Sequence, residues 1–214
     1  MSNLGLLYHF DLDGVLSGIA ISRKFKFKRK IYLDYSKDFS YLKSYCDEFV
    51  IVDYGENVCG EKTILYLDHH LTDKKYDSCL QKIVEEGYIE KSEIGEDNLN
   101  CVNIVDSNKY IFNEEFSHED LIFPNINTNL GRYIAINQLL YKNKPHSLVL
   151  LESNTFDSEL LMEKIGKKTF KEYILSKEKF LESFIKNKNK HIQYINNIPL
   201  IITNFIDKNQ WKGY

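Results

Sequence analysis

The stretch LGLLYHFDLDGVLSGIAIS, residues 4–22, decides how this chain begins to fold. Its apolar run over residues 4–8 has the length of a buried strand and closes on polar residues. Over residues 15–25 the apolar residues instead recur at helical spacing, for example at Leu16 and Ile19. The stretch therefore predicts a strand, a turn and a helix.

The same alternation of strand and helix continues along the chain. The further expected strands are 30–35, 49–52, 63–67 and 102–105, and the further expected helices are 39–46 and 77–86. Strands that alternate with helices predict a largely parallel sheet that is covered by helices on both faces. The expected fold class is therefore α/β, with a parallel sheet flanked by helices.

The second half of the chain has a different pattern. From Gly131 onward the apolar residues recur at helical spacing, and a short strand is expected at 199–205. We therefore expect an α/β domain over residues 1–125, followed over residues 126–214 by a helical region with a C-terminal strand. The pattern leaves open whether this second region belongs to the same domain.

Composition and charge narrow the class of protein. Hydrophobic residues make up 43% of the 214 residues and charged residues 28%, which is typical of soluble globular proteins, and no apolar run is long enough to span a membrane. The formal net charge of −3 argues against an extended surface for long duplex nucleic acid. The four cysteines form no CxxC pair, and the N-terminus lacks a signal pattern. We therefore expect a cytoplasmic protein with reduced thiols and leave its oligomeric state open.

Side chains of the types that bind metal ions, carboxylates and imidazoles, follow the predicted strands one after another. They are His9, Asp11 and Asp13 after the first strand, Asp53 after the third, Asp68, His69 and His70 after the fourth, and Asp106 after the last. Because the carboxyl ends of parallel strands meet at one edge of a sheet, these residues should lie together. A single aspartate after a strand is more often a helix cap, but so many carboxylates together would repel one another unless cations lay between them.

The donor types indicate the metal and the chemistry. Carboxylates and imidazoles suit Mn²⁺, Mg²⁺ or Zn²⁺, and a pair of such ions can activate water to hydrolyse a phosphate ester. Ser17 and Gly18, interpreted as opening the first helix, would offer a hydroxyl and backbone N–H groups to a phosphate oxygen. The pattern therefore predicts a two-metal phosphoesterase.

Four segments in this order resemble the signature motifs of the DHH phosphoesterase family. They are HFDLDGVLSG (9–18), IVDYG (51–55), YLDHHLT (66–72) and IVDSN (104–108). That family includes RecJ-type exonucleases, oligoribonucleases, cyclic-dinucleotide phosphodiesterases, exopolyphosphatases and family II inorganic pyrophosphatases. The resemblance implies hydrolysis with manganese or magnesium. No counterpart of the GGGH motif in the family's second domain is found in the sequence, which leaves open the substrate and whether the chain is a minimal form or a truncated one.

The resemblance also implies a role for each motif residue. It assigns six ligands to two divalent cations, Mn²⁺ or Mg²⁺: His9 and Asp11 to one ion, Asp13, His69 and Asp106 to the other, and Asp53 to both. His70 would contact the phosphate, and Asp68 would orient the neighbouring histidines by hydrogen bonding.

The function expected from these motifs is hydrolysis of phosphodiester bonds in a short oligonucleotide or nucleotide-like substrate. Two alternatives stay open. The segment FDLDGVL (10–16) also resembles the first motif of haloacid dehalogenase-type phosphatases, in which Asp11 would be the nucleophile and Asp13 the acid/base, but this leaves His9 and Asp53 without a role. The site could also bind a metal or nucleotide without turning it over.

Overall fold

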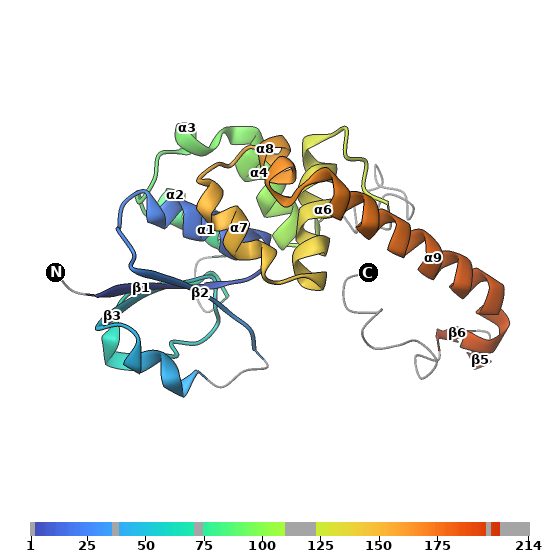
Figure 1. Cartoon of the computed structure of the whole chain (residues 1–214), viewed down its shortest axis with the longest axis horizontal. Helices are drawn as coiled ribbons and strands as arrows, with labels where there is room; N and C mark the ends of the chain where they lie inside the picture. Colours follow the sequence, from blue (N-terminus) through green and yellow to red (C-terminus); the bar gives the residue numbers. More distant parts are fainter. Residues whose placement is uncertain (1–2, 36–38, 71–74, 110–122, 196–197, 202–214) are drawn as a thin grey trace.

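The computed structural model describes residues 3–35, 39–70, 75–109, 123–195 and 198–201 (Figure 1). The strands are β1 (Leu4–His9), β2 (Arg29–Leu33), β3 (Glu48–Val52), β4 (Thr63–Leu67), β5 (Ile192–Ile195) and β6 (Ile198–Ile201). The α-helices are α1 (Leu12–Ser22), α2 (Cys79–Glu85), α3 (Lys91–Ile94), α4 (Glu96–Asp106), α6 (Asn129–Lys142), α7 (His146–Ser153), α8 (Ser158–Ile165) and α9 (Lys167–His191). Two 3₁₀ helices, η1 (Ser40–Ser44) and η2 (Gly60–Lys62), precede β3 and β4.

Strands β1 to β4 form one parallel sheet in the order β2-β1-β3-β4. Leu6 in β1 lies opposite Lys30 in β2 on one side and Val50 in β3 on the other. The expected parallel α/β sheet is therefore confirmed. The chain leaves β1 toward β2 and returns to β3 on the opposite side, so the strand order reverses beside the carboxyl ends of β1 and β3. Open parallel sheets bind ligands at such a crevice.

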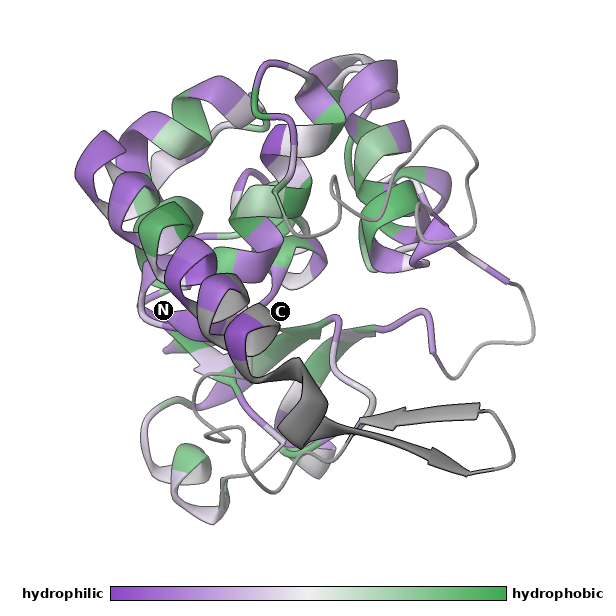
Figure 2. Ribbon diagram, turned by 90° about the vertical axis from the view of Figure 1, so that its right-hand side faces the viewer, coloured by the Kyte–Doolittle hydropathy of each residue, from purple (hydrophilic) through white to green (hydrophobic). Residues whose placement is uncertain are grey.

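Side chains alternate between the two faces of the sheet, as strand geometry requires. Leu6 and Tyr8 of β1 join a large buried cluster with the α-helices, whereas Leu7 joins a smaller cluster that includes Leu42 of η1. Among the described residues, the α-helices therefore cover one face, and η1 packs on the other. Figure 2 shows that the central strands are largely hydrophobic, whereas the helices mix hydrophilic and hydrophobic positions.

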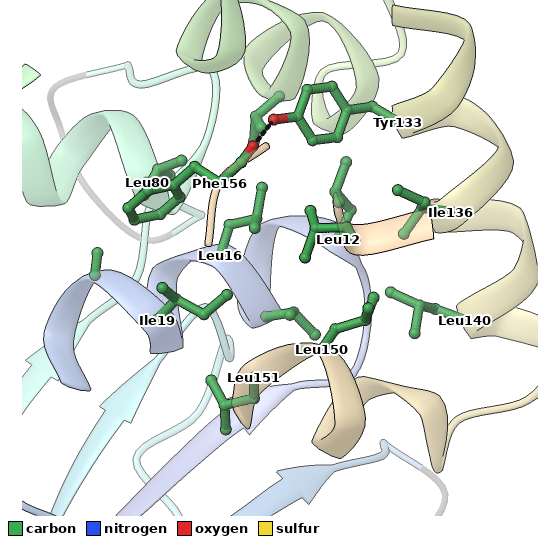
Figure 3. Packing of buried hydrophobic residues seen from close by; sticks show 14 of the residues in the cluster. Leu12, Leu16, Ile19, Leu80, Tyr133, Ile136, Leu140, Leu150, Leu151 and Phe156 are labelled. Carbon is green, nitrogen blue, oxygen red and sulfur yellow. Dashed lines mark hydrogen bonds between the residues drawn. The ribbon is translucent and has the colours of Figure 1, made fainter. Parts of the chain in front are cut away.

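The helices of the second half pack on the same core as the strands. In Figure 3, Leu16 of α1 lies among side chains that include Leu150 of α7 and Ile136 of α6. The hydroxyl of the buried Tyr133 donates a hydrogen bond to the carbonyl of Phe156, which ties α6 to the segment before α8. This packing places Asn137 and Tyr141 of α6 beside the turn that follows β1, where the polar motif residues lie.

The strand expected at 102–105 is wrong, because these residues belong to helix α4. Leu99, Val102 and Val105 stand three residues apart and are all buried, so they form one apolar helical face. A run of four mostly apolar residues does not distinguish a buried helix from a strand. Asp106 is consequently the last residue of a helix and does not follow a strand.

Three other boundaries differ from expectation. The first helix begins at Leu12 because Asp11 caps it, and the helix expected at 39–46 is the shorter 3₁₀ helix η1. The C-terminal strand is β6, which pairs antiparallel with β5, and residues 202–205 of the expected strand lie outside the described residues.

Two further features of the described residues bear on the composition. All four cysteines are buried and free of disulfides. Within the ranges that the structure describes, no helix combines the length and apolar character that crossing a membrane requires.

Candidate metal centre

The turn between β1 and α1 places His9 and Asp11 together. Asp11 caps α1: its Oδ1 accepts a hydrogen bond from Gly14 N at 3.0 Å. Its Oδ2 lies 2.7 Å from His9 Nδ1. A Cβ atom at Gly14 would lie 2.2 Å from the carbonyl oxygen of His9, so only glycine allows the turn to close this tightly. Asp11 is thus both a helix cap and a neighbour of His9.

Asp53 stands at the end of β3 in an unusual backbone conformation. Its φ of 51° lies in the left-handed region, which aspartate tolerates better than most residues. Its Oδ2 is 3.8 Å from His9 Nδ1 and its Oδ1 is 3.6 Å from His69 Nε2. Oδ1 is buried and makes no hydrogen bond with the described residues. Strained backbone and an unsatisfied buried oxygen are typical of functional sites.

Asp13 links the first turn of α1 to the start of α2. Its carboxylate accepts hydrogen bonds from Cys79 N at 2.6 Å and Leu80 N at 3.0 Å. Its Oδ2 also lies 4.0 Å from His69 Nε2. Asp106 approaches the same nitrogen from the end of α4, at 3.2 Å. Together with Asp53 at the end of β3, aspartates from three segments distant in sequence therefore approach the ring of His69.

The Asp-His-His triplet follows β4. The buried carboxylate of Asp68 accepts a hydrogen bond from His70 N at 3.0 Å, and its other oxygen lies 2.9 Å from His70 Nδ1. Lys82 Nζ donates to the carbonyl oxygen of Asp68 at 2.9 Å. His69 Nδ1 instead lies 3.4 Å from the carbonyl oxygen of Tyr76. Asp68 therefore orients His70 directly, whereas the ring of His69 contacts the backbone carbonyl of Tyr76.

The motif residues form two ligand groups. The first ligand group is His9, Asp11 and Asp53, and the second ligand group is Asp13, His69 and Asp106. Within each group, one ligand atom from every residue lies within 4.8 Å of the others. Asp53, His69 and His70 make a third combination at the same spacing. All six expected metal ligands are thus close together, and Asp53 of the first ligand group lies 3.6 Å from His69 of the second.

The electrostatics of the centre favour bound positive charge. Burial and the neighbouring Asp13 raise the pKa of Asp53 well above its ordinary value. Burial and Asp106 raise the pKa of Asp13 to about 7. Burial lowers the pKa of His69, but Asp106 and Asp13 raise it more, to about 9. Buried carboxylates that hold protons this tightly are stabilised by cations, so the donor set fits divalent metal ions.

The expected position of Ser17 and Gly18 at the helix N-terminus is wrong, because α1 begins at Leu12. Ser17 is fully buried, and its hydroxyl donates to Asp13 Oδ1 at 3.4 Å. Gly18 packs beneath Leu151, whose Cδ1 would lie 2.7 Å from an added Cβ atom. These two residues support the aspartate and the core, and the structure does not present them to a phosphate.

The centre opens into a cleft of about 680 Å³. Its walls also include residues that no sequence motif marks: Tyr35, Tyr76 and Tyr141, with Lys75 and Lys109. The hydroxyl of Tyr141 donates to Asp11 Oδ2 at 3.4 Å from helix α6. Aromatic residues at helical spacing most often form a core, so no local signal marks Tyr141 as part of a site.

Comparisons with known proteins add no family assignment. No protein-family model matches this sequence, and no curated protein matches it. The resemblance to DHH phosphoesterases therefore rests on the four motifs.

Proposed function

We propose that this protein is a phosphoesterase that uses two divalent cations, Mn²⁺ or Mg²⁺, to hydrolyse phosphodiester bonds in a short oligonucleotide or nucleotide-like substrate. The observation that carries the proposal is the position of Asp53. Its two carboxylate oxygens face His9 of the first ligand group and His69 of the second, at 3.8 and 3.6 Å. A carboxylate placed in this way can serve both groups at once.

The two ligand groups would each hold one ion. When bound, a pair of such ions would lower the pKa of a water molecule and polarise the phosphoryl group of the substrate. The carboxylates of the centre balance the charge of the cations, and Asp53 joins the two groups. The backbone N–H groups of α2 that bond to Asp13 hold this ligand in a fixed orientation.

His70 has the position of a phosphate contact. Its side chain is 52% exposed, and its Nδ1 is engaged by Asp68, which leaves Nε2 for the cleft. The hydrogen bond with Asp68 raises the pKa of His70. A protonated imidazole donates a charge-assisted hydrogen bond to a phosphoryl oxygen as negative charge develops there.

The burial and hydrogen bonds of Asp13 argue against the dehalogenase-type alternative. In that scheme Asp13 must exchange a proton with the substrate. Here Asp13 is 1% exposed, and its oxygens accept hydrogen bonds from two backbone N–H groups. These contacts and this burial separate its carboxylate from a substrate with which it would exchange a proton. The alternative also gives no role to the carboxylate of Asp106 beside His69.

The direct test is hydrolysis of bis(p-nitrophenyl) phosphate with Mn²⁺, Mg²⁺ or chelator. We expect p-nitrophenol release that depends on the metal. Short RNA, short DNA, cyclic dinucleotides, pyrophosphate and a phosphomonoester would then be compared by their products. Binding of Mn²⁺ without hydrolysis of any of these would contradict the proposal and indicate a non-catalytic binding protein. A phosphate adduct trapped on Asp11 would support the dehalogenase-type scheme instead.

A further inference from the structure

Tyr35 occupies the rim of the cleft beside the first ligand group. It follows β2 at the carboxyl end of the sheet and is 59% exposed. Its ring centroid lies 5.4 Å from that of His9. An exposed aromatic side chain this close to a metal-ligand residue can contact whatever group is attached to the reacting phosphate.

The ring of Tyr35 is held from one side. It stacks on Tyr54 with a centroid distance of 4.5 Å and an angle of 15° between the ring planes. Tyr54 is itself buried, with Phe39 packed edge-on against it at 6.1 Å. Gly55 N donates a hydrogen bond to the Tyr35 hydroxyl at 3.4 Å. Tyr54 covers one face of the ring, and the large exposed fraction of Tyr35 leaves the opposite face uncovered by the residues that the structure describes.

Tyr141, which also lines the cleft, is arranged differently. Tyr141 meets Phe10 edge-on, at an interplanar angle of 80°, and directs its hydroxyl to Asp11. Its role is therefore polar, toward the ligand group. Tyr35 combines an open ring face, a rigid backing and a position next to the centre.

We propose that Tyr35 is the platform on which the base of the substrate stacks, so that the substrate is a nucleotide diester and not a base-free phosphate. This inference rests on the function proposed above and specifies its substrate class. Every nucleobase has a flat aromatic face, so stacking on tyrosine favours nucleotides without selecting one sequence. Lys75 on the wall of the cleft supplies positive charge for a further phosphate, whereas Lys109 is paired with Asp77 at 2.5 Å.

The experiment compares a dinucleotide with the same molecule carrying abasic sugars. Tyr35→Ala should raise KM for the dinucleotide by about tenfold or more, as expected for the loss of one stacked base. Its KM for the abasic substrate should stay within about twofold of wild type, since the ligand groups are intact. Tyr35→Trp keeps an aromatic face for stacking and should retain the lower KM for the dinucleotide relative to the abasic substrate. Tyr41→Ala, which removes an exposed tyrosine of η1 that does not line the cleft, is the matched control.

A binding measurement separates this inference from the proposed function. Calorimetry with adenosine monophosphate should show binding to wild type and Tyr35→Trp, and weaker binding to Tyr35→Ala. Suppose that the wild type hydrolyses diesters but that Tyr35→Ala changes KM equally for the dinucleotide and the abasic substrate, or changes neither. The stacking role is then overturned while the phosphoesterase function stands. If no diester is hydrolysed, the proposed function fails, and the effect of Tyr35→Ala on nucleotide binding still decides whether the ring stacks on a base.

Discussion

The two ligand groups use the same kinds of side chain but are held in different ways. The first ligand group stands at the ends of β1 and β3, which are hydrogen-bonded neighbours in the sheet. The second ligand group comes from α1, from the segment after β4 and from the end of α4, so helix packing sets its geometry. The side chain of Asp106 is 18% exposed, against 2% for Asp53. A site assembled in this way has one rigid half and one half that depends on the position of α4.

The largest effect is expected where the two groups meet. Asp53→Asn should lower kcat/KM by about 10³-fold or more, because the amide removes the charge that serves both groups. Titration with Mn²⁺ should show the loss of two-ion binding. Asp47→Asn, at the opposite end of β3, is the control and should behave like wild type. Activity of Asp53→Asn within about tenfold of wild type would remove Asp53 from its joining role.

Asp106→Asn should separate the two groups. We expect calorimetry to detect one tightly bound Mn²⁺ in this variant, since the first ligand group does not contain Asp106, and turnover to fall by about 10²-fold. Glu96→Gln, at the exposed start of the same helix, should have neither effect. Loss of both ions in Asp106→Asn would mean that the two groups cannot be filled independently.

His70→Ala tests whether His70 belongs to the metal ligands, in addition to the three members of each ligand group. With Asp68 holding its Nδ1, His70 should act on the phosphate, so the variant should bind two Mn²⁺ ions and turn over about 10²-fold more slowly. Loss of one ion in the titration would show that the combination of Asp53, His69 and His70 is the one that binds metal.

The smallest effect is expected from the packing beneath the second group. Val105 is buried in α4, directly before Asp106. Val105→Ala should lower the free energy of unfolding by about 1–2 kcal/mol and weaken one of the two Mn²⁺ sites by a few-fold. Val149→Ala, at an exposed position of α7, should change neither quantity. Equal weakening of both Mn²⁺ sites would contradict the division into a rigid and a packing-dependent half.

The strands were predictable where a short apolar run ends in polar residues. This holds for β1, β3 and β4, which lie within two residues of the expected positions. The expected strand at 102–105 is part of helix α4, because apolar content alone does not separate a strand from a buried helix, whereas the three-residue spacing of Leu99, Val102 and Val105 is helical. Asp106 nevertheless lies beside His69, because the end of a packed helix can reach the same edge of the sheet.

The donor types of the candidate centre, on which the proposed binding of divalent cations rests, can be derived from the residues alone, since they are a property of side-chain chemistry. The motif order also indicates that these residues act together. The grouping around Asp53, the different supports of His69 and His70, and the presence of Tyr35 and Tyr141 in the cleft depend on the folded chain. They follow from the strand order and from the packing of α6 and α4, which are contacts between distant segments that no local pattern encodes.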